Sequence, residues 1–290
     1  MRKQSSSLAV LKVILALAFL LSASLAQEPT VVRSTVKGPI DLNGFQLSKV
    51  YSNDFSKGQK IIFETDLIGN ENGKWVRTSM PDAKAEWIVE GNGGVDIKDG
   101  ELRASPVPFD PKGKQLLDEA RSHLVVWNRN IFPADLLIEF DMRPNGSTSG
   151  LTILFFSAAG KDGGDIFDMK LLPRLADYKA YHSGEIVDYS DSYWSRNTEV
   201  ESVTNRLRKN PGFLLVAEGE SLTTGPTDVT HHVRVLKFGG HVEIEVNGKV
   251  VSEWNDPGKP LGAGRIGFRS MDGVKMITYD NLKVWRLRKR

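Results

Sequence analysis

Hydrophobic and polar residues alternate along much of the chain after residue 84, with the period of two that is typical of half-buried β-strands. Between residues 242 and 246, valine and isoleucine alternate with glutamate. The pairs Gly239-Gly240 and Asn247-Gly248 supply turns on either side, so 233–254 predicts antiparallel strands joined by tight turns.

The same pattern recurs in four other segments. Three short strands are predicted over 84–105, one each over 135–144 and 150–160, and two over 264–287 with Asp272-Gly273 as the turn. A helix is predicted around 112–124, but the regular long helices of a βαβ protein are missing. The pattern therefore predicts an all-β fold with short helical insertions, either a sandwich of two antiparallel sheets or a jelly roll.

Residues 1–26 have the features of a secretory signal peptide. A basic start precedes the apolar run LAVLKVILALAFLL, and Ser24-Leu25-Ala26 resembles a cleavage site. We therefore expect an exported protein, periplasmic or extracellular, with lead-in strands over 27–83 and a jelly-roll domain over 84–290. The chain contains 0 cysteines, which excludes disulfides and thiolate metal sites.

Removal of the signal peptide changes the charge. The peptide carries Arg2, Lys3 and Lys12 and no acid, so the formal net charge falls from +2 to −1. A nearly neutral mature protein gives no argument for nucleic acid as a partner, nor for a membrane once the signal is removed.

Several motifs occur in the order found in a known family. HLVVWNRNIFPADLLIEFDMRP, GLTILFFSAAGKDGGDIFD, YHSGEI and RLRKNPGFLLVAEG, followed by GRIGFRS and YDNLKVW, resemble the YesU-like family over about residues 84–287. This is a bacterial family of concanavalin A-like jelly-roll proteins of unassigned function, encoded among polysaccharide utilisation genes. The resemblance implies a fold and a carbohydrate partner, but no reaction.

The stretch YHSGEIVDYSDSYW (181–194) follows neither a strand nor a helix period and concentrates chemically active groups. We predict catalytic roles here for His182, Glu185 and Tyr181, together with Arg208 from the next family-like segment. In an extended chain His182 and Glu185 would point to opposite faces, so they cooperate only if Gly184 bends the chain.

Other residues of the family-like segments are predicted to bind substrate. Arg269 suits a uronic acid or a sulfate group, because a guanidinium group binds such anions through two hydrogen bonds. Tyr193 and Trp194 are expected to stack on sugar rings, with core packing as the alternative. His123, Asp165 and Asp168 complete the predicted site.

Two further sets of acidic residues are weaker candidates for a functional role. Jelly-roll glucanases carry three acids as E-x-D-x-x-E; Glu139 and Asp141 match the first two, but Pro144 replaces the third. No cofactor is required by the sequence, although a structural calcium ion is an open alternative at KDGGDIFD (161–168) or at Asp280-Asn281.

Three functions fit these features. The first is an enzyme, either a polysaccharide lyase or a glycoside hydrolase, acting on an acidic polysaccharide or oligosaccharide. The second is a carbohydrate-binding module without catalysis, and the third is a partner surface in a larger degradative assembly. The sequence leaves the sugar, the linkage and the oligomeric state open.

Overall fold

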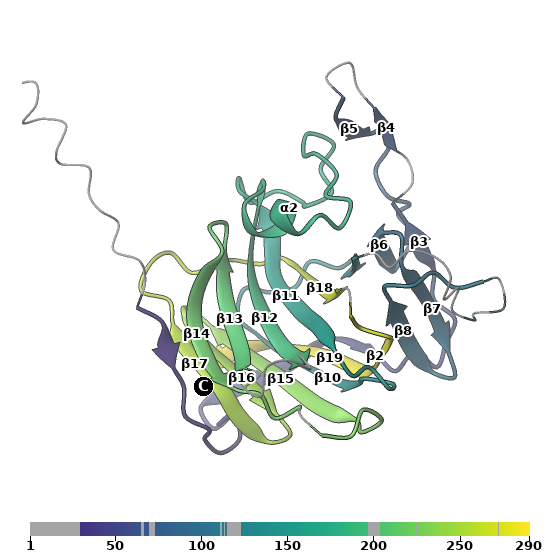
Figure 1. Ribbon diagram of the computed structural model, residues 1–290. Coiled ribbons are helices and arrows are strands. Elements are labelled where there is room, and N and C mark those ends of the chain that lie inside the picture. The colour runs from purple at the N-terminus through teal and green to yellow at the C-terminus, as the bar shows by residue number, and fades with distance from the viewer. Residues whose placement is uncertain are drawn as a thin grey trace, which may run out of the picture.

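Two packed β-sheets form the protein in the computed structural model, which describes residues 30–64, 67–69, 73–110, 112, 114, 123–196, 204–223, 225–271 and 273–290. The predicted signal peptide, residues 1–26, lies outside the described residues, as does most of the helix predicted over 112–124. Within the described part, no helix is long and apolar enough to cross a lipid bilayer. The all-β jelly-roll prediction is confirmed (Figure 1).

The first sheet has nine strands. In spatial order they are β1 (Val32–Arg33), β14 (Leu214–Glu220), β13 (Thr204–Asn210), β12 (Ile186–Arg196), β11 (Gly150–Gly160), β18 (Arg265–Ser270), β9 (Leu124–Asn128), β6 (Trp87–Gly91) and β3 (Ile61–Phe63). The edge pairs β1–β14 and β3–β6 are parallel, and the other pairs are antiparallel.

The second sheet has eight strands. They are β17 (Lys249–Asn255), β16 (His241–Val246), β15 (His231–Phe238), β10 (Leu136–Arg143), β19 (Ile277–Lys289), β8 (Glu101–Ser105) and β7 (Gly94–Lys98), with β2 (Phe45–Asn53) paired to β19. A small separate hairpin, β4 (Leu67–Gly69) and β5 (Trp75–Arg77), projects from the sandwich (Figure 1).

Inward-facing aromatic and aliphatic side chains of both sheets build the main core. Phe140 of β10 contacts Phe268 of β18 edge to face, with 5.1 Å between ring centroids, and Phe268 stacks on Tyr279 of β19 at 4.2 Å. These rings join the two sheets because offset and edge-to-face contacts add to the free energy gained by burying apolar area.

The strands predicted over 84–105, 135–144, 150–160, 233–254 and 264–287 are present. Strands β18 and β19 do not form the predicted hairpin, however, because they belong to opposite sheets; Asp272 of the predicted turn lies outside the described residues. Strand pairing is a long-range contact that a local alternation of residues does not specify. The lead-in segment also joins the sandwich, since β1, β2 and β3 pair with β14, β19 and β6.

Candidate functional site

The outer face of the nine-stranded sheet, which points away from the main core, is partly covered by residues 161–185. Strand alternation places Trp127 and Phe155 on this face, where Tyr181 of the covering segment stacks on both. The three rings are buried, and the centroid distances to Tyr181 are 6.4 Å and 5.4 Å. The cover is therefore packed like a second small core.

A buried carboxylate, Glu90 of β6, fixes this cover. It accepts hydrogen bonds from Trp127 Nε1 at 2.9 Å and Tyr181 Oη at 2.6 Å, and it forms an ion pair with Arg174. Burial raises the pKa of Tyr181 well above its ordinary range, so the phenol stays protonated. Tyr181 is thus an anchor of the cover, and we correct its predicted catalytic role.

The short helix α2 (Tyr178–His182) leads into strand β12 (Figure 1). The rings of its first and last residues, Tyr178 and His182, contact each other. Asp177 caps its N-terminus by accepting from Lys179 N at 3.1 Å. The helix ends at His182 with Ser183 as its C-cap, and an added Cβ at the following Gly184 would lie 2.1 Å from the carbonyl oxygen of Ala180. The switch from helix to strand β12 explains why residues 181–194 follow no single period.

An aromatic cluster forms where α2 meets the turn after β13. The His182 ring lies 4.8 Å from Tyr178 and 4.6 Å from Phe213, and Gly212 N donates to the His182 carbonyl at 2.7 Å. Desolvation, and then the positive charges of Arg208 and Arg269, lower the pKa of His182. The imidazole is therefore neutral at pH 7 and able to accept a proton.

Two arginines flank this cluster. The Arg208 guanidinium lies over the Phe213 ring, 3.8 Å from its centroid, and donates to the Phe213 carbonyl at 3.1 Å. Arg269 is fully buried and packs against Tyr178 and Tyr181, at 5.1 Å and 4.9 Å from the ring centroids.

Arg269 lacks an anionic partner within the described part of the chain. Its Nη2 donates to His123 Nδ1 at 2.9 Å and to the Ala176 carbonyl at 3.0 Å, whereas Nε and Nη1 have no hydrogen-bond partner among the described residues. Burial of a cation without a carboxylate partner costs free energy. The charge of Arg269 also gives a positive potential beneath α2.

Asp188 was not among the predicted site residues. It is fully buried on the outer side of β12, where Oδ1 accepts from Asn210 Nδ2 at 2.8 Å. Burial raises its pKa to about 7. The Asp188–Asn210 pair lies at the base of the turn that carries Phe213, which gives it a positioning role. The sequence signal that could have indicated Asp188 is its i, i+2 spacing from Ser190, which places both polar side chains on one face of a strand.

The structure therefore brings together His182, Arg208, Arg269 and His123, four of the predicted residues. Glu185 has different partners from His182: its Oε2 accepts from Leu172 N at 3.3 Å, whereas His182 Nδ1 contacts Ser183 Oγ at 2.6 Å. Gly184 does bend the chain, but it does not make this His–Glu pair.

Tyr193 and Trp194 belong to the main core and are 1% and 0% exposed. A register shift in β12 changes the pairing between Thr152–Trp194 and Leu154–Asp191, so two consecutive side chains enter the core. Neither ring is accessible to a sugar, which corrects their predicted stacking role.

The acids of the 161–168 loop are paired with cations of the protein. Arg265 Nε donates to Asp165 Oδ1 at 2.9 Å, and this guanidinium lowers the pKa of Asp165 against the effect of burial. Asp162 and Asp168 both contact Lys170. These contacts indicate loop-stabilising roles, and they disfavour the predicted calcium site in this loop because the carboxylates already have cationic partners.

Glu139 and Asp141 lie on the outer face of the other sheet. Both contact one histidine: His232 Nε2 is 3.1 Å from Glu139 Oε1, and Nδ1 is 2.7 Å from Asp141 Oδ1. The side chain of Asn281 donates to the remaining oxygen of Asp141 at 2.9 Å. These acids form a surface network remote from the aromatic cluster.

A cavity of about 660 Å³ borders the other end of β11 and β12. Its lining combines the apolar side chains of Leu151 and Met271 with hydroxyl groups of Thr148, Ser149 and Ser195. Leu151 and Met271 also pack against the apolar cluster beneath the cover. The outer face therefore carries polar groups at both ends of β11 and β12, with the aromatic cluster and its arginines at one end and this cavity at the other.

Comparison with known proteins places the chain in a family. A domain of unknown function, DUF1961, matches residues 76–284. The chain belongs to the DUF1961 family. The uncharacterized protein YesU of Bacillus subtilis is 35% identical over 210 residues, which cover 70% of this chain and 90% of YesU. The YesU-like resemblance is thereby confirmed.

Solved structures support the same fold. A protein of unknown function with a galectin-like fold from Bacillus subtilis has 29% identity and a TM-score of 0.65, covering 85% of this chain and 100% of that one. SCLam, a non-specific endo-β-1,3(4)-glucanase of family GH16, has 11% identity and a TM-score of 0.51, covering 91% and 98%. At that identity, the likeness to SCLam concerns the fold alone.

Proposed function

We propose that the DUF1961 protein binds a uronate-containing glycan on the outer face of the nine-stranded sheet and cleaves it by β-elimination. The observation that carries this proposal is the meeting of a neutral imidazole, a protonated phenol and a half-buried guanidinium at one edge of the cover. A lyase needs these three groups, namely a base, an acid and a cation beside the uronate.

Arg208 is the group that contacts the uronate. One nitrogen of its guanidinium is used by the Phe213 carbonyl, and the planar group keeps further N–H donors for a carboxylate. Neutralising this carboxylate makes the neighbouring C5 proton of the sugar more acidic. Arg269 acts from below through its charge, because its side chain is fully buried.

His182 is the base and Tyr178 the acid of the reaction. The imidazole takes the C5 proton, the C5–H electron pair forms the C4=C5 double bond, and the C4–O bond breaks. Tyr178 gives its proton to the leaving oxygen; burial, the largest effect, raises its pKa and keeps it protonated beforehand. Exchange with water then returns His182 and Tyr178 to their starting states.

The hydrolase alternative has less support. It would require two carboxylates at one bond, drawn from Glu185, Asp165 and Asp168. Asp165 is engaged by Arg265, and Asp168 contacts Lys170. The pair with the buried Arg265 therefore makes Asp165 unavailable as the partner of Glu185, and Lys170 competes for Asp168.

The outer face offers two contact points for a glycan, at opposite ends of β11. β11 has 11 residues, which corresponds to roughly 35 Å at the rise of an extended strand. The aromatic cluster lies at one end of this strand and the cavity beside Leu151 at the other. The outward side chains between them are buried, since Ile153 and Phe155 of β11 are 3% and 2% exposed, so the glycan contacts this face at its two ends. We expect the reaction to take place outside the cytoplasm if residues 1–26 direct export.

Incubation with a panel of uronate-containing polysaccharides and oligosaccharides tests this function. We expect ultraviolet absorbance from a conjugated C4=C5 double bond in the product, and loss of this signal in H182A. Y178F is the sharper variant, because it keeps the ring and removes only the proton donor. It should retain glycan binding while losing turnover.

The same experiment separates catalysis from simple binding. A non-catalytic carbohydrate-binding module would retain the glycan through Arg208 and the aromatic cluster and release no unsaturated product. Reducing ends without a double bond would instead indicate hydrolysis. The absence of both binding and turnover across the whole panel would refute the proposed function.

A further inference from the structure

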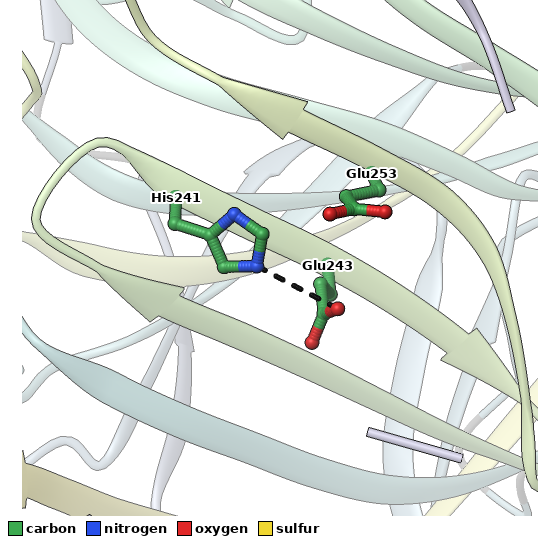
Figure 2. Close-up of side chains that lie close together, drawn as sticks. All are labelled: His241, Glu243 and Glu253. Carbon is green, nitrogen blue, oxygen red and sulfur yellow. Dashed lines mark ion pairs between the residues drawn. The ribbon is translucent and has the colours of Figure 1, made fainter. Parts of the chain in front are cut away.

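A separate cluster on the outer face of the eight-stranded sheet combines one histidine with two glutamates. His241 and Glu243 come from β16, and Glu253 comes from the adjacent strand β17 (Figure 2). One ligand atom from each side chain lies within 4.8 Å of the other two. All three residues are partly buried, so they are both accessible and held by the sheet.

Strand geometry explains why these side chains meet. His241 and Glu243 are two residues apart and therefore share a face of the sheet, and Glu253 is the cross-strand partner of Glu243. Two like charges directly opposite each other destabilise a sheet. The arrangement therefore favours a cation between the two carboxylates.

The histidine is oriented for ligation. Its Nδ1 lies 2.9 Å from Asn255 Oδ1, and an amide oxygen only accepts, so Nδ1 carries the hydrogen. The lone pair of the neutral ring is then on Nε2, which faces Glu243 Oε1 at 3.5 Å. A second hydrogen-bond partner that fixes the tautomer in this way is a regular feature of metal-binding histidines.

The geometry points to a site for one divalent transition-metal ion of the zinc type, ligated by His241 Nε2, Glu243 and Glu253, with the fourth position open to water. Zinc bonds of about 2.0–2.2 Å to nitrogen and oxygen place tetrahedral ligand atoms about 3.4 Å apart. The His241–Glu243 distance of 3.5 Å already fits, and Glu253 has to move inward by a side-chain rotation. An imidazole ligand favours zinc over calcium, which takes oxygen ligands.

Lys37 competes with the metal ion for the carboxylate of Glu253. Its ammonium group forms an exposed ion pair with Glu253 and must release this carboxylate when the metal binds. Exposed ion pairs contribute little free energy, so the competition weakens metal binding without preventing it. K37A should therefore bind zinc roughly two- to fivefold more tightly than the wild type.

Titration of the tag-free chain with ZnCl₂, followed by calorimetry and thermal unfolding, tests this site. We expect one zinc ion per chain and a rise in Tm, both lost in H241A, with much weaker binding in E253Q. H232A is the matched control: His232 lies on the same sheet, but Glu139 and Asp141 contact its two ring nitrogens. It should bind zinc like the wild type.

Electron paramagnetic resonance of the Cu²⁺-loaded protein gives a readout that does not depend on folding stability. The spectrum should show coupling to one imidazole nitrogen in the wild type and in H232A, and none in H241A. Absence of zinc binding, equal binding in H241A, or tighter binding of Ca²⁺ than of Zn²⁺ would each overturn the inference.

Discussion

The buried carboxyl of Asp188 makes stability depend on pH in a direction opposite to that of an ordinary salt-bridged acid. Its pKa rises from 3.8 to about 7, chiefly through burial. The folded chain therefore binds more protons than the unfolded chain between these values, and stability falls as the pH increases through this window. Below pH 3.8 the carboxyl is protonated in both states and causes no penalty.

The size of the effect follows from the pKa. A carboxyl with a pKa of about 7 in place of 3.8 carries an ionisation penalty of about 4 kcal/mol above pH 7. We expect D188N to recover about 2–4 kcal/mol of this penalty at pH 8. Its amide keeps an acceptor for Asn210 Nδ2 and adds a donor for Asn210 Oδ1, which has no partner among the described residues.

Denaturant unfolding of wild type and D188N at pH 5, 6, 7 and 8 measures this effect. The variant should be more stable at pH 8, and the difference should shrink steadily towards pH 5. D191N is the matched variant on the same strand, because Asp191 is also buried, has a pKa raised to about 8 and faces the main core. A D188N variant that is less stable than the wild type at pH 8 would refute the reasoning.

Substitutions at three other residues test separate parts of the structure. W194A should lose about 3–5 kcal/mol of stability, because it leaves a cavity in the core. W194F should keep the glycan affinity of the wild type, measured by calorimetry. Weaker glycan binding by folded W194F would show that Trp194 does contribute to the binding site. E90Q should lose about 3–5 kcal/mol, measured by denaturant unfolding, because it leaves Arg174 without its buried partner; an unchanged stability would contradict the anchoring role. R208K should weaken the binding of a uronate-containing glycan about tenfold, since a lysine lacks the planar pair of donors. The affinity for a neutral glycan should stay unchanged.

The fold was predictable because the β-strand period is local. Alternation along 242–246 and the turns beside it are sufficient to identify β16 and its neighbours. The partners of β18 and β19 were not predictable in this way, because the alternation is the same whichever sheet a strand joins.

The site was predictable only in part, because it depends on contacts between distant segments. His182, Arg208 and Arg269 were found from chemical type and family-like motifs. Tyr178 and Phe213 were missed because their contacts with His182 arise only when α2 packs against the turn after β13.

Strand β12 departs from strict alternation, which would turn one of two consecutive aromatic residues outward. The register shift near Thr152 turns both Tyr193 and Trp194 inward. A bulge inserts a residue without a clear sequence signal, and it therefore changes the face of every side chain after it.

The central claim is that His182 removes a proton from a uronate sugar. The most direct measurement is the formation of unsaturated product from uronate-containing glycans as a function of pH, in wild type, H182A and Y178F. Because the pKa of His182 is lowered from 6.5, the acid limb of kcat/KM in the wild type should lie below pH 6.5. Unsaturated product formed by H182A at the wild-type rate would contradict the account.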